Sequence, residues 1–92
     1  MQRAGFAAHV HDEWTVRFGD ARRTWRLVEV TEPTRTGDFE SYSIMFEPDT
    51  PAAGQGTVVV DHPVAGEFEL FVVAIAAHRF EAVVNQLVSE PA

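Results

Sequence analysis

The stretch EFELFVVAI, residues 67–75, decides the fold of this 92-residue chain. Its apolar side chains alternate between two faces, with Phe68, Leu70, Val72 and Ala74 on one and Phe71, Val73 and Ile75 on the other. Because residues two apart share a face of a strand, the pattern predicts a β-strand that is apolar on both sides beyond its start. Such a strand belongs in the middle of a sheet.

Shorter strands are expected on either side of it. Residues 14–18, 24–31 and 41–47 alternate in the same way, and residues 57–60 (TVVV) are β-branched. Residues 24–31 and 41–47 are expected to pair as an antiparallel hairpin with a long connection. Gly and Pro break the chain at 19–20, 33–38, 48–56 and 61–66. We therefore predict an all-β domain, a small antiparallel barrel or sandwich of six or seven strands.

At the two ends of the chain, the sequence leaves open whether the residues form a helix or a strand. Within residues 79–88, apolar side chains recur at helical spacing, which favours a C-terminal helix, yet Phe80, Ala82 and Val84 also alternate as in a strand. Residues 3–8 fit a short helix or a lead-in strand. The whole of residues 1–92 is expected to be one domain, with a polar tail at 89–92.

Composition limits the function. Fourteen acidic residues oppose seven arginines with no lysine, for a formal net charge of −7. A negative surface repels phosphate backbones and anionic lipids, so neither nucleic acid nor membrane is expected as a partner. An acidic inhibitor that mimics DNA stays open as an alternative. The lack of cysteine excludes disulfides and thiolate chemistry.

No targeting segment is expected. The first ten residues lack the apolar run of a secretory signal, and the longest unbroken apolar run, residues 70–77, is too short for a spanning helix of about twenty residues. We therefore expect a cytoplasmic protein.

Metal ligands are densest around His9 and His11. In an extended chain these two share a face, with Asp12 and Glu13 beside them, and His62 or His78 would have to complete a site. Because no established ligand spacing supports a site, we favour a solvated polar segment and expect no metal or other cofactor.

The pair Asp61-His62 is a candidate catalytic base. A hydrolase would need His62 or His78 to lie beside a nucleophile in a cleft. No serine sits in a nucleophile elbow, and Asp61-His62-Pro63 is more simply a turn with a structural hydrogen bond. Gly54-Gln55-Gly56 is too short for a phosphate cradle, and its glycines are expected at positive φ. Glu67 and Glu69 are expected to guard a strand against edge pairing. The protein is thus not expected to be an enzyme.

Several separated elements resemble a family of small, uncharacterised bacterial domains. They are Gln55-Gly56, His62-Pro63 with Gly66, Leu70-Phe71-Val72, and Phe80-Glu81-Ala82-Val83 with Asn85. The resemblance spans roughly residues 6–86. It implies an all-β domain whose last strand is Phe80–Asn85, although the family has more residues before that strand than residues 76–78 supply. It also implies a place beside phage-tail-like proteins.

A domain of 92 residues has little material to bury both faces of a strand that is apolar on each side. Leu70, Phe71, Val73 and Ile75 are therefore candidates for an interaction surface, buried by a second copy or by a protein partner. The predicted function is a non-enzymatic assembly or interaction module, accessory to a phage-tail-like or surface structural protein. The alternative is a small-ligand-binding barrel with an interior cavity lined by Trp14, Trp25 and Phe46.

Overall fold

A computed structural model describes residues 3–87 and confirms the all-β class. One short helix precedes seven strands in this part of the chain. The elements are α1 (Arg3–Ala7), β1 (Glu13–Phe18), β2 (Ala21–Val30), β3 (Thr34–Thr36), β4 (Phe39–Glu47), β5 (Gln55–His62), β6 (Gly66–Ala76) and β7 (Arg79–Leu87).

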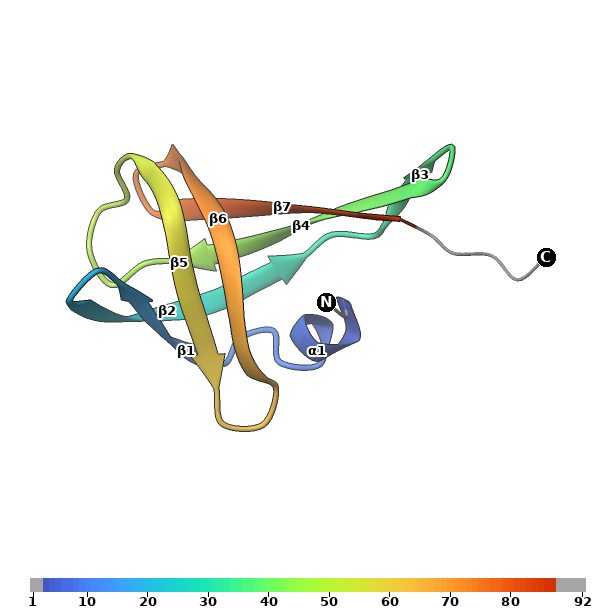
Figure 1. The fold of residues 1–92 in the computed structure, drawn as a ribbon. Coiled ribbons are helices and arrows are strands. Elements are labelled where there is room, and N and C mark those ends of the chain that lie inside the picture. The colour runs from blue at the N-terminus through green and yellow to red at the C-terminus, as the bar shows by residue number, and fades with distance from the viewer. Residues whose placement is uncertain (1–2, 88–92) are drawn as a thin grey trace.

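The strands form one antiparallel sheet that closes on itself. Their order is β2-β1-β5-β6-β7-β4-β3, and an additional β2–β4 pairing joins the two ends. Six strands of the described residues therefore make a closed ring, and β3 adds a short edge to β4 (Figure 1). The fold is a small barrel rather than a sandwich. As predicted, β6 is a central strand, paired with β5 and β7.

The alternation seen in the sequence directs side chains into the barrel. Leu70 and Val72 of β6 are buried, whereas Phe71 and Ile75 are exposed. A chain of aromatic contacts runs along the interior from Phe6 through Trp14, Phe46 and Trp25 to Phe80. The hairpin predicted from residues 24–31 and 41–47 is confirmed by the β2–β4 pairing, although β3 lies within its expected loop.

The choice between helix and strand that the sequence left open for residues 79–88 is settled over its described part, because residues 79–87 form strand β7, as the family resemblance implied for Phe80–Asn85. Phe80 and Ala82 point inward beside Phe46 and Ile44 of β4. Val83 points outward, so the apolar stripe of a helix is divided between two faces of a strand. Val88 and the tail predicted at 89–92 lie outside the described residues.

Residues 3–7 form helix α1, which settles the open choice at the N-terminal end. Phe6 is fully buried and stacks on Trp14 at 5.2 Å between ring centroids. Arg3 donates hydrogen bonds to the carbonyl oxygens of Val30 and Thr31, at and just past the end of β2. The helix therefore covers one end of the barrel, which we call the closed end (Figure 1).

Beyond the barrel, β4 and β7 continue together as an arm (Figure 1). The pairing between β6 and β7 covers only Val73–Ala76 and Arg79–Glu81, whereas β4 stays paired with β7 as far as Leu87. The two strands β6 and β7 thus separate after a few residues. The five-residue α1, the only helix among residues 3–87, is too short to cross a membrane.

Candidate functional site

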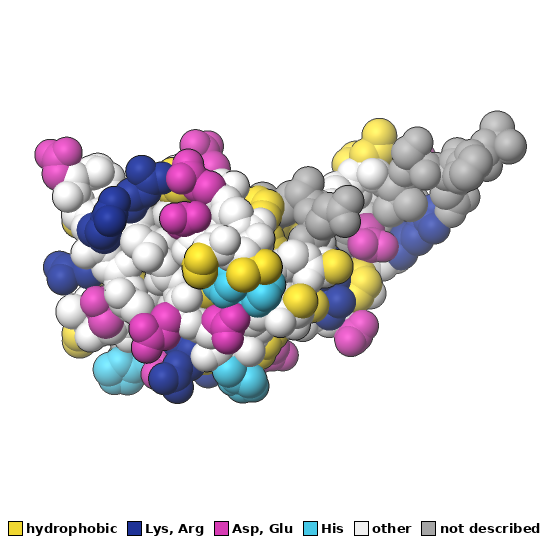
Figure 2. Space-filling model, turned by 90° about the horizontal axis from the view of Figure 1, so that it is seen from below, with side chains coloured by type: hydrophobic (Ala, Val, Ile, Leu, Met, Phe, Trp, Pro, Cys, Tyr) yellow, Lys and Arg dark blue, Asp and Glu magenta, His cyan; other side chains and the backbone are white. Residues whose placement is uncertain are grey.

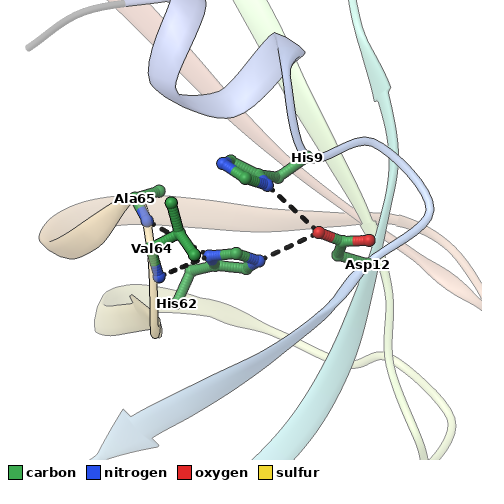
Figure 3. A network of polar contacts seen from close by, with 5 residues as sticks. All are labelled: His9, Asp12, His62, Val64 and Ala65. Atoms are coloured by element: carbon green, nitrogen blue, oxygen red, sulfur yellow. Dashed lines mark hydrogen bonds and ion pairs between the residues drawn. The ribbon is translucent and has the colours of Figure 1, made fainter.

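Three polar side chains from distant parts of the chain meet at the closed end (Figure 3). His9 follows α1, Asp12 precedes β1, and His62 is the last residue of β5. One carboxylate oxygen, Asp12 Oδ2, lies 3.1 Å from His9 Nδ1 and 3.0 Å from His62 Nε2. Because strand alternation turns His62 inward below Trp14, its side chain is only 6% exposed.

The surroundings of His62 fix its tautomer. Its Nδ1 accepts hydrogen bonds from the backbone N–H groups of Val64 and Ala65, at 3.0 and 3.1 Å. The proton of the neutral ring must then sit on Nε2, from which it is donated to Asp12. Both ring nitrogens are occupied, so His62 has no free lone pair to act as a general base.

The three side chains form a clasp between the α1–β1 connection and the β5–β6 turn. Hydrogen bonds from His62, and then from His9, lower the pKa of Asp12 below its ordinary value. The cause is stabilisation of the charged carboxylate by donors on both rings. The structural hydrogen bond predicted for His62 agrees with this geometry, but the predicted turn begins only at Pro63, because Asp61 and His62 are the last two residues of β5, and Asp61 is not the partner of His62.

A metal ion fits this cluster poorly. The ligand atoms of His9, Asp12 and His62 lie within 4.8 Å of one another. A metal would need the lone pair of His62 Nε2. To free this lone pair, the ring proton of His62 would have to move to Nδ1. It would then point at the N–H groups of Val64 and Ala65, and both of their hydrogen bonds to Nδ1 would be lost.

His9 and His11, the two candidate metal ligands, do not come together. His11 lies at the positive φ of 78° and uses its backbone N–H to bond Leu27, while only His9 joins the cluster. His78, the other predicted ligand, lies in the β6–β7 turn, away from it. The contact between Asp12 and His62 could not be predicted from the spacing of ligand residues in the sequence, because 50 positions separate the two.

The outer face of β6 holds most of the predicted interaction surface. Phe71 is 53% exposed and Ile75 50%, and Val73 is partly exposed. Leu70 is the exception: it lies in the core, because it alternates inward. Val83 of β7, at 57% exposed, adds to the apolar side chains near the point where β6 and β7 separate.

The end of the barrel opposite α1, which we call the mouth, is hollowed. A groove of about 330 Å³ lies there. Trp25 and Phe80 stack on each other at 4.5 Å in its lining. Of the three residues predicted to line a cavity, only Trp25 does so, whereas Trp14 and Phe46 are packed inside the core.

Charge is mixed on the surface. Arginines and carboxylates are interspersed on the face shown in Figure 2. Glu67, one of the two predicted guarding residues, bonds Arg17 of β1 at 2.7 Å. No continuous acidic surface of the kind a DNA mimic needs is visible on this face.

The fold and these sites define a small closed antiparallel barrel with one clasped end and one open end. Residues 1–84 match the family described as "Domain of unknown function (DUF6916)", and the chain belongs to that family. The family resemblance drawn from the sequence motifs is thereby confirmed as membership of a domain family of unknown function. Comparisons with curated proteins and with solved structures found no match.

Proposed function

We propose that this domain is a non-enzymatic assembly module in which two copies pair through the free edge of β7. The observation that carries the proposal is the backbone of residues 82–87. Among residues 3–87, only β4 pairs with this segment, on one side. The N–H and C=O groups of the other side form a template for a further strand.

Where β6 and β7 separate, each strand has an unpaired edge, and the two edges differ in how well they are protected against the addition of another strand. Residues 67–72 of β6 carry Glu67 and Glu69, which discourage strand addition. Residues 82–87 of β7 (AVVNQL) carry no charge and no proline. An unprotected edge of this composition favours a covering strand, and nothing on it repels a second copy.

The outward side chains of β7 suit pairing with themselves. Val83, Asn85 and Leu87 share one face, and Leu87 is 66% exposed. In an antiparallel pair of β7 strands centred on Asn85, Val83 of each copy lies opposite Leu87 of the other. A two-fold axis then buries two apolar pairs, as an isologous interface requires.

Light scattering after size-exclusion chromatography, from low to high micromolar concentration, tests this arrangement. We expect the wild type to dimerise and the double variant Val83→Lys/Leu87→Lys to weaken dimerisation at least about tenfold, because like charges then lie opposite each other. The variant Val83→Lys/Leu87→Glu places opposite charges there and should restore the dimer.

The control is Val64→Lys, since Val64 is 77% exposed in the β5–β6 turn, away from the arm. This variant should dimerise like the wild type. A wild type that stays monomeric at high micromolar concentration would overturn the proposal, and so would a charge-swapped variant that behaves like the double lysine variant.

The absence of catalysis is part of the proposal and is supported by the occupied nitrogens of His62. Among residues 3–87, the hydrogen bond recorded for the Ser41 hydroxyl is to Asn85 on the arm and not to a histidine. An accessory place beside a phage-tail-like or surface structural protein is a further proposal, and it rests on the family resemblance alone.

A further inference from the structure

Gly56 has no structural need to be glycine. Its φ is not positive, unlike that of Gly54 at 75°, so the sequence prediction of positive φ holds only for Gly54. Gly56 pairs with Val72, which points inward, so a side chain at this position would also point into the barrel mouth. A Cβ there would meet no atom within 4 Å. A glycine within a strand often marks the close approach of a ligand, and here it keeps the groove open.

Charge at the mouth departs from that of the whole chain. The chain carries fourteen acidic residues, yet no Asp or Glu is among the described residues that line the groove. Arg23 is its one charged residue. Because Arg23 pairs with the inward-facing Val16, it lies on the inner side of β2.

Arg23 also lacks an internal partner. Within residues 3–87 it makes no ion pair or hydrogen bond, whereas Arg3 and Arg17 both bond glutamates. A guanidinium at the rim of an apolar groove favours a carboxylate, which it can bind through two parallel hydrogen bonds.

Most of the remaining lining is apolar, with Thr50, Gln55 and Thr57 as polar side chains, and the lining is held in place. Trp25 and Phe80 offer aromatic surface, and Val58 and Val72 add aliphatic surface. The loop between β4 and β5 forms part of the rim. Two backbone hydrogen bonds fix this loop, from Ala52 to Ala77 and from Ala74 to Gly54, at 2.7 and 2.9 Å. The site is therefore formed before a ligand arrives, which lowers the entropic cost of binding.

We propose that the mouth of the barrel binds a small carboxylate with an aromatic or compact apolar body. Arg23 bonds the carboxylate, the body lies against Trp25 and Phe80, and the missing side chain of Gly56 leaves room for it. The groove of about 330 Å³ is at the small end of ligand sites, which limits the ligand to a single ring or short chain. This site is separate from the β7 edge, so neither proposal depends on the other.

Phenylacetate and its uncharged analogue phenylacetamide are suitable probes, because they differ only in the group offered to Arg23. The chain has two tryptophans, so two-dimensional NMR shows two indole N–H signals, which Trp25→Phe assigns. Trp14 lies at the closed end and serves as the internal control. Phenylacetate should shift the Trp25 signal with a Kd on the order of 1 mM, while the Trp14 signal stays in place.

Two variants test the parts of the site. Arg23→Gln removes the charge and should weaken phenylacetate binding at least about fivefold, with little effect on phenylacetamide. Its matched control is Arg22→Gln, since Arg22 is the neighbouring exposed arginine and pairs with Arg17 on the outer side of the barrel. Gly56→Leu, whose Cβ meets no atom within 4 Å, fills the mouth and should abolish binding of both probes.

Three results would overturn the proposal. The first is a Trp25 signal that does not move at saturating phenylacetate. The second is equal affinity for phenylacetate and phenylacetamide, which would remove the role of charge. The third is an Arg22→Gln variant as weak as Arg23→Gln. Each variant is compared by its own NMR spectrum, so a change of fold is visible in the same experiment.

Discussion

His62 performs two structural tasks that substitution can separate. Its Nδ1 accepts the N–H groups of Val64 and Ala65, and its Nε2 donates to Asp12. An asparagine side chain can accept the same two backbone groups, as in an Asx turn, but does not reach Asp12. A glutamine side chain has an amide nitrogen in reach of Asp12 but leaves the turn without its acceptor.

The turn bonds should contribute more than the bond to Asp12. Two hydrogen bonds at about 0.5–1.5 kcal/mol each give roughly 1–3 kcal/mol for the Nδ1 side, whereas solvent weakens the bond to the exposed carboxylate of Asp12. We expect His62→Asn to lose about 1 kcal/mol and His62→Gln about 2 kcal/mol. His62→Ala loses both sets of bonds and leaves a void beside Trp14, which should cost about 3–4 kcal/mol.

Urea unfolding followed by tryptophan fluorescence measures these differences, since both tryptophans are buried in the core. One kcal/mol corresponds to a shift in Tm of about 4–8 °C for a domain of this size, so the order is easily resolved. A glutamine variant more stable than the asparagine variant would refute the assignment of the tautomer. An alanine variant within about 0.5 kcal/mol of the wild type would refute the clasp altogether.

Three further predictions concern the closed end. The pKa of Asp12 is lowered in the folded state, so its carboxylate stabilises the fold above the ordinary pKa of 3.8 and loses this effect as pH falls through the lower folded value. The difference in unfolding free energy between wild type and Asp12→Asn, measured by urea unfolding, should therefore shrink below pH 3.8. A difference that stays constant with pH would contradict this prediction. One equivalent of Zn²⁺ at neutral pH should leave the Tm unchanged in differential scanning fluorimetry, because His62 offers no lone pair; a rise that disappears in His9→Ala would show a metal site. Phe6→Ala should cost about 3–5 kcal/mol in urea unfolding, since Phe6 is fully buried against Trp14 and Phe68, and a loss below about 1 kcal/mol would show that α1 is dispensable.

The strands could be predicted from the sequence because each has a local pattern. The alternation of residues 67–75 gave the correct faces of β6 and its place between two neighbours. The β2–β4 pairing could be predicted as a hairpin, but the choice between a barrel and a sandwich could not, since closure of the ring depends on the length and twist of all the strands together. Residues 3–7 carry too few side chains for a helical period, and only the contact of Phe6 with Trp14 and Phe68 decides their structure.

The candidate sites were less predictable, because they depend on contacts between distant residues. His62 could be placed next to a turn from its neighbour Pro63, but its bond to Asp12 joins residues 50 positions apart. Similarly, Arg23 and Gly56 belong to different strands, and neither has a local pattern that indicates a groove. The groove forms where the starts of β2 and β5 lie at the same end of the barrel, because both strands pair antiparallel with β1.

The helical spacing of apolar residues at the C-terminal end and the proposed assembly surface have one physical origin. A strand with one solvated face alternates apolar and polar residues, and β7 would then resemble an ordinary strand. Its apolar residues instead occur on both faces, with Phe80 and Ala82 inward and Val83 and Leu87 outward. Apolar residues on both faces of a strand produce the same i, i+3, i+4 spacing in the sequence as one face of a helix. A strand that is apolar on both faces is typical of a position covered on both sides, and among residues 3–87 only the inner face of β7 is covered. In the proposed pair, the outward Val83 and Leu87 contact Leu87 and Val83 of the second copy across the two strands, at an edge without charge or proline.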